Sequence, residues 1–397
     1  MSNSFSIRLL SVLTVIAVSS GVLTSCSEKL DKETLPAPTT TASESSESSE
    51  TEPSETEPSL GPNSTAVVTD RIVDLHGQLS VNGTGIVDEH GNPVQLTGMS
   101  SYGLNACAGF FNPNTVKTLA EDWGCDVLRF AMTTRGNSDD YTRDPDKYFT
   151  EMCNCINLCI DQGIYVIVDW HILFDGDPNE FKAESIDFFT RISTIYGNEP
   201  NVIYEICNEP NGMRFDDESQ PVDWDNCIRP YAVDVVSAIR AHDPDNIIII
   251  GTPTWSQDVD IASANPVTGD NLMYTTHFYA GSHGQELRDK ISTALSNGCA
   301  VFVTEWGTTA DSGKGQIFDT EVYEWIDFLN ENGISWCNWS VGGSNSEASN
   351  ALKFKSPILT IEEKYAGHWP DEFLSNSGLL VRSLILERTE AQTQEDD

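Results

Sequence analysis

Positive charge is scarce in this sequence. Its 397 residues include 22 Lys and Arg against 61 Asp and Glu, which gives a formal net charge of −39 at pH 7. A nucleic-acid partner is therefore not expected, because binding to a phosphate backbone needs a basic surface. The excess negative charge is instead typical of a soluble exported protein, in which like charges oppose aggregation.

The sequence also lacks the usual signals for a cofactor or a metal. No glycine-rich phosphate turn follows its first predicted strand, and no cysteine spacing matches a structural zinc site. Three of the ten cysteines, Cys207, Cys299 and Cys337, lie inside apolar runs, where a disulfide framework is not expected. We therefore expect no cofactor, no metal and mostly free thiols.

Apolar residues are nearly absent from residues 26–66, which are mainly Ser, Thr, Glu and Pro. Such a segment buries too little apolar area to offset the entropy of ordering, so we expect a disordered stalk. The apolar run within residues 1–25 is too short for a comfortable membrane span and follows one basic residue, as in an export signal.

Leu23-Thr24-Ser25-Cys26 resembles a bacterial lipobox, in which cleavage before the cysteine leaves its thiol to carry lipid. This favours a cell-surface lipoprotein that contacts the membrane only through Cys26. The alternative is an ordinary signal peptide and a secreted protein. Residues 67–387 are then expected to form the folded domain, and residues 388–397 an acidic tail.

Within the predicted domain, apolar runs alternate with helix-like segments. Most runs are continuous rather than alternating, as in parallel strands that are buried on both faces. The eight runs are 94–100, 127–132, 164–171, 202–209, 246–252, 272–277, 300–305 and 334–340. The pattern predicts an α/β fold, a single (β/α)₈ TIM barrel, with a short hairpin before it at 75–96 and a closing helix at 370–385.

Nearly every apolar run ends in a polar residue, which is where a barrel enzyme keeps its chemistry. Glu209 and Glu305 end the fourth and seventh runs, so the barrel should bring them together across its mouth. Hydrolysis of a glycosidic bond needs one carboxyl group as proton donor and another that attacks or stabilises the anomeric carbon. We interpret Glu205, four residues before Glu209, as a buried polar group inside the barrel.

Five stretches of this chain resemble glycoside hydrolase family five, and specifically its bacterial endoglucanase branch. They are IYVIVDWH, VIYEICNEPNG, NIIIIGTPTWSQD, HFYAGSHGQELRD and VFVTEWGT, in the family's order. The resemblance implies a retaining endo-β-1,4-glucanase that acts by double displacement on cellulose-like glucans. We further expect it to be a monomer.

The same resemblance implies a role for each catalytic residue. Glu209 would be the acid/base and Glu305 the nucleophile that forms the glycosyl-enzyme. Arg129 would lie against Glu305 and keep it ionised by charge pairing. Tyr279 would donate a hydrogen bond to Glu305, and His277 would stay near Glu209.

Further residues would contact the sugar. The resemblance implies that Asn208 holds the 2-hydroxyl group and that His171 contacts the ring on the non-reducing side of the cut. Trp339 would offer that ring a flat apolar face, and Trp255 and Trp170 are further stacking candidates.

Two stretches depart from the family pattern. The loop after the first run usually carries a His and then a Trp, where this chain has Tyr102 and Ala106, so we expect Tyr102 to contact substrate instead. The family usually places a Lys about four residues after the Ser that follows Trp339, and residues 341–347 contain none. These changes leave a mannanase, a xyloglucanase or a mixed-linkage glucanase as alternatives, with a non-catalytic glucan-binding lipoprotein as the alternative outside enzymes.

Overall fold

Eight parallel strands close into a barrel in the computed structural model, which describes residues 71–107, 109–136, 139–212, 222–343, 347–353 and 359–395. In order around the barrel they are β4 (Thr97–Ser101), β5 (Val127–Thr133), β6 (Tyr165–His171), β7 (Val202–Glu205), β8 (Ile248–Ile250), β9 (Leu272–Thr275), β11 (Val301–Gly307) and β12 (Trp336–Val341). Pairing of β9 with β11 and of β12 with β4 completes the circle, and the short β10 (Phe278–Tyr279) adds to the end of β11. The predicted (β/α)₈ barrel is confirmed, with one barrel strand in each of the eight apolar runs.

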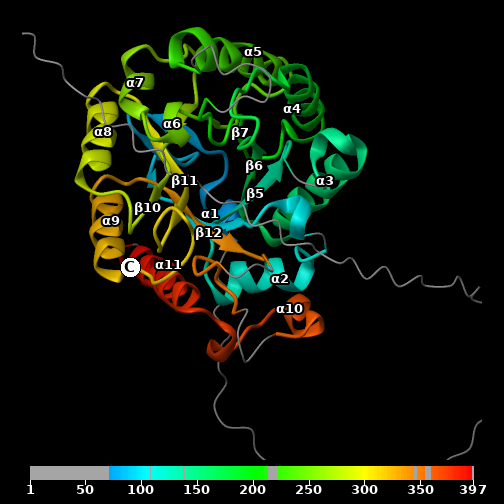
Figure 1. Ribbon diagram of the computed structural model, residues 1–397, viewed down its shortest axis with the longest axis vertical. Coiled ribbons are helices and arrows are strands. Elements are labelled where there is room, and N and C mark those ends of the chain that lie inside the picture. Colours follow the sequence, from blue (N-terminus) through cyan, green and yellow to red (C-terminus); the bar gives the residue numbers. More distant parts are fainter. Residues whose placement is uncertain are drawn as a thin grey trace, which may run out of the picture. The chain divides into compact units, whose positions relative to one another are not determined.

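Helices surround the strands (Figure 1). The longer ones are α3 (Pro145–Gln162), α4 (Lys182–Tyr196), α5 (Arg229–Arg240), α8 (Gln285–Ser296), α9 (Asp319–Glu331) and α11 (Asn376–Glu395). Shorter ones are α1 (Ile72–His76), α2 (Pro113–Lys117), α6 (Pro253–Ser256), α7 (Val259–Ala264) and α10 (Ile361–Ala366). Helices α2 and α3 each start at a proline, whose fixed φ suits the first helical turn.

The hairpin expected at 75–96 is present as a three-stranded antiparallel sheet. It contains β1 (Ser80–Asn82), β2 (Gly85–Val87) and β3 (Pro93–Val94). Ile86 and Val94 of this sheet join an apolar cluster with inward-facing barrel residues such as Ile167 and Ile203. The sheet therefore contributes to the apolar packing at the N-terminal end of the barrel.

The last helix differs from the prediction. We expected it at 370–385 with a loose tail from 388, but α11 begins at Asn376 and runs to Glu395. A short 3₁₀ turn, Asp371–Phe373, occupies the predicted start. Residues 376–395 contain one Gly near their start and no Pro, and Leu, Glu, Arg and Gln, which favour helix, recur along them. Nothing in the sequence therefore stops the helix at residue 385.

The export signal, Cys26 and the stalk lie outside the described residues, so these remain predictions. Among the residues that are described, no helix combines the length and hydropathy that a membrane span requires.

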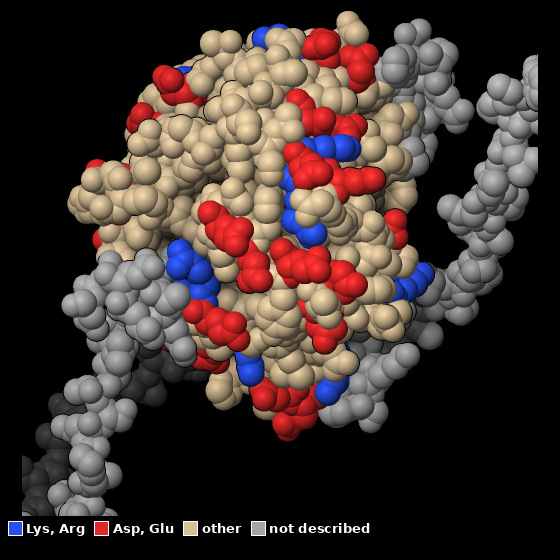
Figure 2. Space-filling view, turned by 90° about the vertical axis from the view of Figure 1, so that its left-hand side faces the viewer, with Lys and Arg blue, Asp and Glu red and all other residues tan. Residues whose placement is uncertain are grey.

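The nine cysteines from Cys107 to Cys337 are all free thiols, as predicted. Acidic side chains are spread over the face in Figure 2, and the basic side chains there lie among them.

Alternation along the strands places a polar layer above the apolar end of the barrel. Val127 and Ile167 belong to the apolar cluster, and two residues further along each strand come Arg129 and Asp169. On β7 the residue two positions after Ile203 is Glu205, which pairs in register with Asp169. Because side chains repeat with a period of two along a strand, these three polar residues share one interior layer.

Candidate active site

Arg129 is the centre of the buried polar layer. Its guanidinium group donates to both oxygens of Glu205 (Nε to Oε2, 2.7 Å; Nη2 to Oε1, 3.1 Å) and lies 2.8 Å from Asp169 Oδ2. It also donates to Glu305 Oε2 (3.1 Å) and Asn208 Oδ1 (2.6 Å). Glu205 is thus buried and fully paired, as predicted for a polar group inside the barrel.

The layer holds one arginine against three carboxyl groups, so their pKa values separate. Burial disfavours the charge of Glu205, but Arg129 and His277 outweigh it and lower the pKa of Glu205 to about 2. Burial raises the pKa of Asp169 well above its usual range despite the contact with Arg129. The main ion pair of the layer is therefore Arg129 with the ionised Glu205, while Asp169 favours its neutral, protonated form.

Glu209 lies four residues beyond the end of β7, on a loop rather than on the strand where we expected it. The loop is fixed by the backbone NH of Asn208, which donates to Trp170 O (3.2 Å), and by Ser256 Oγ, which donates to Asn208 O (2.6 Å). His277, between β9 and β10, then donates from Nδ1 to Glu209 Oε1 (2.9 Å). This contact confirms the predicted pairing of His277 with Glu209.

His277 connects the candidate acid to the polar layer. Its Nε2 lies 3.0 Å from Thr304 Oγ1, which in turn donates to Glu205 Oε1 (2.8 Å). Burial disfavours the imidazolium, but the nearby carboxylates of Glu205 and Glu209 outweigh it and raise the pKa of His277 to about 9. His277 is therefore positively charged at neutral pH and donates from both ring nitrogens.

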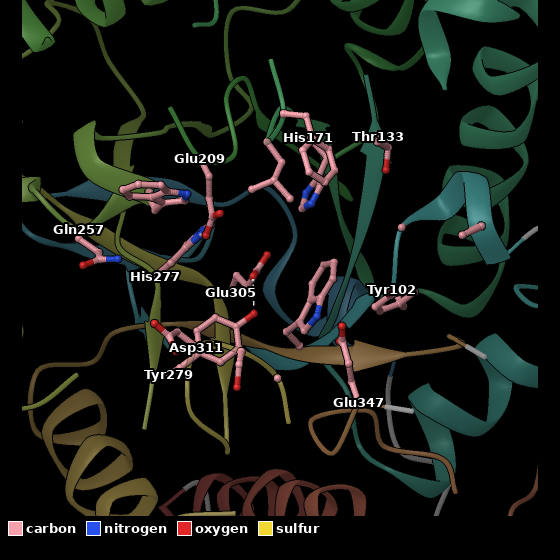
Figure 3. Close-up of a pocket in the computed structure, with 18 of the residues that line it drawn as sticks. Tyr102, Thr133, His171, Glu209, Gln257, His277, Tyr279, Glu305, Asp311 and Glu347 are labelled. Carbon is pink, nitrogen blue, oxygen red and sulfur yellow. Dashed lines mark hydrogen bonds and ion pairs between the residues drawn. The ribbon is translucent and has the colours of Figure 1, made fainter. Parts of the chain in front are cut away.

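Glu305 is on β11 and faces Glu209. Tyr279 Oη donates to its Oε1 (2.9 Å) and Arg129 Nη1 to its Oε2 (3.1 Å), so both predicted partners are confirmed. One ligand atom each of Glu209, His277 and Glu305 fall within 4.8 Å of one another. Figure 3 shows Glu305 between Tyr279 and the pair formed by Glu209 and His277.

The pKa of Glu305 corrects one expectation. We expected Arg129 to keep this carboxyl group ionised, yet burial, together with the charge of Glu209, raises the pKa of Glu305 despite Arg129 and His277. Two carboxyl groups so close together cannot both carry charge at low cost. Glu305 therefore holds a proton more readily than an isolated glutamate does.

His171, Trp339 and Tyr102 form one wall of the cleft. The rings of His171 and Trp339 stack with centroids 5.5 Å apart and planes within 6°, and Tyr102 lies 5.6 Å from Trp339. His171 Nδ1 is 2.7 Å from Asp169 Oδ2. Burial and the charge of Arg129 lower the pKa of His171 to about 4, so it is neutral at pH 7 and offers one acceptor nitrogen.

The cleft has a volume of about 1040 Å³. Its lining includes the predicted residues Glu209, Glu305, His277, Tyr279, His171, Trp339, Trp255 and Tyr102. Asn208 is fully buried and does not line it, because Arg129 and the carbonyl of Ile172 occupy its amide group. Its predicted contact with the sugar 2-hydroxyl group stays a prediction.

The two further tryptophan candidates differ. Trp255 is 38% exposed in the cleft and follows Thr254 in a turn of left-handed residues, with φ of 59° and 55°. Its backbone NH donates to Pro210 O (3.2 Å), which holds the turn against the Glu209 loop. Trp170 was a wrong candidate, because it is fully buried and packs against Tyr141 and Phe188 on the helix side of β6.

The structure adds residues that the motifs did not single out. Thr304 links His277 to Glu205, and Ser256 fixes the Glu209 loop. Among the described residues, Glu209, His277 and Glu305 are also the one group spaced to hold a metal ion. Both nitrogens of His277 are already engaged in hydrogen bonds, so this arrangement fits acid–base chemistry better than metal ligation.

Known proteins match this chain closely. The sequence model described as "Cellulase (glycosyl hydrolase family 5)" matches residues 87–345. The "Endoglucanase" of Clostridium saccharobutylicum is 47% identical over 309 residues, 78% of this chain and 65% of its own length. "Endoglucanase 5" of Pectobacterium carotovorum is 46% identical over 79% of this chain and 58% of its own length. The chain therefore spans less than two thirds of these two relatives.

Solved structures agree with the sequence comparison. The catalytic domain of the Thermobifida fusca endoglucanase Cel5A superposes with a TM-score of 0.72 and 34% identity, over 80% of this chain and all of that domain. A variant of that domain is known in complex with cellotetraose. On the family match and these likenesses, the chain belongs to glycosyl hydrolase family 5.

Proposed function

We propose that this protein is a retaining endo-β-1,4-glucanase that hydrolyses internal bonds of cellulose-like glucans. The observation that carries the proposal is the approach of Glu209 and Glu305, which have carboxylate oxygens within 4.8 Å of each other. Retaining glycosidases keep their two carboxyl groups about 5 to 5.5 Å apart, whereas inverting enzymes leave about 6.5 to 9.5 Å for a water molecule.

In the first step, Glu209 gives its proton to the glycosidic oxygen while Glu305 attacks the anomeric carbon. The bond to the leaving sugar breaks, that sugar departs with a new hydroxyl group, and an ester joins Glu305 to the remaining chain. Arg129 and Tyr279 hold the two oxygens of Glu305 in place for attack.

In the second step, a water molecule attacks the anomeric carbon through its oxygen, and Glu209 accepts a proton from that water. The ester bond breaks, Glu305 leaves as a carboxylate, and the product keeps the β configuration. His277 stays charged beside Glu209 through both steps and stabilises the carboxylate that forms when the proton leaves.

The substrate assignment rests on the cleft wall and on the relatives. Stacked rings such as Trp339 suit the apolar face of a glucose unit. The two relatives described above are named endoglucanases, and a variant of the Thermobifida fusca domain is known in complex with cellotetraose. We therefore propose β-1,4-linked glucan as the substrate of this family 5 domain.

The proposal is tested by following the hydrolysis of cellopentaose by ¹H NMR. The β-anomer of the new reducing end should appear first and convert to the α-anomer only by mutarotation, because two displacements retain configuration. Early α-anomer would contradict the retaining mechanism.

Initial rates on barley β-glucan, lichenan, mannan and xyloglucan test the substrate assignment. They should be highest on the glucans, and a clear preference for mannan would overturn the assignment.

We also propose that the enzyme acts as a monomer held at the cell surface by lipid on Cys26. This rests on the lipobox-like sequence and on the composition of residues 26–66, which suit a tether for an enzyme whose polymeric substrate stays outside the cell. Cys26→Ala should move the protein from the membrane fraction to the medium. An unchanged membrane fraction would show that lipid on Cys26 does not hold it there.

A further inference from the structure

Helix α10 is a short element fixed beside α2, as Figure 1 shows. Asn112 Nδ2 donates to Tyr365 O (3.1 Å), which holds the end of α10 to the start of α2. Just after α10, the backbone NH of His368 donates to Thr118 Oγ1 (2.8 Å). The helix therefore has a defined position relative to the barrel, although it lies outside the eight strand and helix units.

Lys364 extends from α10 to the chain that follows β12. Its Nζ donates to the carbonyl oxygens of Gly342 (2.6 Å) and Gly343 (3.1 Å), and it lies 5.2 Å from the centre of the Phe110 ring. A charged donor makes stronger hydrogen bonds than a neutral one, and this ammonium group is partly shielded from water. Lys364 thus binds two successive carbonyl groups of one loop.

The backbone held in this way lies against the cleft wall. A Cβ atom added to Gly343 would come within 2.7 Å of Tyr102 Cγ, so the glycine backbone is in direct contact with the tyrosine side chain. The backbone NH of Tyr102 donates to Val341 O (3.0 Å), and its ring lies 5.6 Å from that of Trp339. A shift of residues 342 and 343 would therefore move Tyr102.

We propose that Lys364 is a positioning residue that fixes the Tyr102–Trp339 wall of the cleft for a sugar ring, through the carbonyl groups of Gly342 and Gly343. Lys364 does not line the cleft, so it acts through Tyr102 rather than on the sugar. The inference rests on the proposed glucanase function, because the wall matters only if it binds a sugar.

The test compares Lys364→Met, Lys364→Arg and a matched control. Lys353→Met is that control, because Lys353 also donates to a backbone carbonyl, Glu372 O (2.9 Å), but does not support the wall. For each full-length variant, kcat and KM are measured on cellotetraose, and deuterium uptake is measured in peptides that contain residues 102 and 339–343. Thermal unfolding verifies that each variant is folded.

Lys364→Met should raise KM about tenfold while kcat stays within about twofold, because a misplaced wall weakens ground-state and transition-state binding alike. Deuterium uptake should rise in the two peptides. Lys364→Arg should bring KM within about threefold of the parent, since the charge and donors are kept. Lys353→Met should match the parent in both measurements.

Parental KM and parental deuterium uptake in Lys364→Met would overturn the proposal. An equal rise of KM in Lys353→Met would also overturn it, because the effect would then not be specific to the wall. If the parent protein does not cleave cellotetraose, the proposed function fails. Deuterium uptake still decides whether Lys364 orders the wall in that case, since it needs no substrate.

Discussion

Replacing Glu305 with Gln should lower kcat/KM on a soluble β-1,4-glucan by on the order of 10⁵, as expected when the nucleophile of a catalytic unit is removed. Glutamine has the same size and keeps an oxygen for the hydrogen bond from Tyr279, so the cleft should keep its shape. An amide oxygen is a far weaker nucleophile than a carboxylate, so the ester with the sugar should not form. Release of reducing sugar measures the loss.

Binding separates this effect from a damaged cleft. Cellotetraose should bind to Glu305→Gln with nearly parental affinity in calorimetry, since Trp339, His171 and Tyr102 are unchanged. Glu331→Gln, the same substitution at an exposed position at the end of α9, is the matched control and should keep full activity. Near-parental activity of Glu305→Gln would mean that another group attacks the anomeric carbon.

The strands were predictable because barrel strands are buried on both faces and therefore appear as apolar runs. Inward-facing polar residues such as Arg129 and Glu205 follow from the same regularity, since the period of two carries over from Val127 and Ile203. The motifs that carried the family resemblance supplied the pairing of Glu305 with Tyr279 and of Glu209 with His277. These contacts are local to strand ends, where the fold leaves little freedom.

Irregular backbone limited the prediction elsewhere. Between Val303 and Trp306, β11 carries one more residue than β12, and both Thr304 and Glu305 reach the polar network there. A bulge of this kind breaks the alternation of side chains, and no residue type in the stretch announces it. Thr304 was therefore missed as the link between His277 and Glu205.

The predictions for Trp170 and for the pKa of Glu305 were wrong for a different reason. A tryptophan between Asp169 and His171 has the composition of a binding strand, but alternation turns it to the helix side, where Phe188 covers it. The pKa of Glu305 depends on how much water and how many charges surround one carboxyl group. The balance between burial and neighbouring charges depends on the three-dimensional arrangement of the site. The sequence motifs identify only which residues lie beside Glu305.

Replacing Arg129 with Met should lower the free energy of unfolding at pH 7 by about 3 to 5 kcal/mol, the usual loss when one partner of a buried ion pair is removed. Methionine fills a similar length without charge, so the cavity term stays small. The cost arises at Glu205, which is fully buried and would lose the only guanidinium group that it contacts in the described structure. Urea denaturation followed by tryptophan fluorescence measures the difference.

The same substitution at the surface serves as the control. Arg382 pairs with Asp371 at 2.6 Å, but these side chains are 24% and 71% exposed, so Arg382→Met should cost less than about 1 kcal/mol. A loss of equal size in the two variants would mean that the Arg129 layer is already relaxed by water. In that case its hydrogen bonds could not account for the ionised state of Glu205.

The pH dependence of the Arg129→Met deficit identifies its cause. In the parent, the pKa of Glu205 is lowered to about 2, so its contribution to stability is present above pH 4.5 and is lost only as the pH falls through about 2. Without Arg129, burial should raise the folded pKa of Glu205 above its unfolded value, and the folded variant then gains a proton as the pH falls from 7 to 5. The deficit should therefore shrink over this range. A deficit that stays constant from pH 7 to 5 would assign the loss to packing rather than to an uncompensated carboxylate.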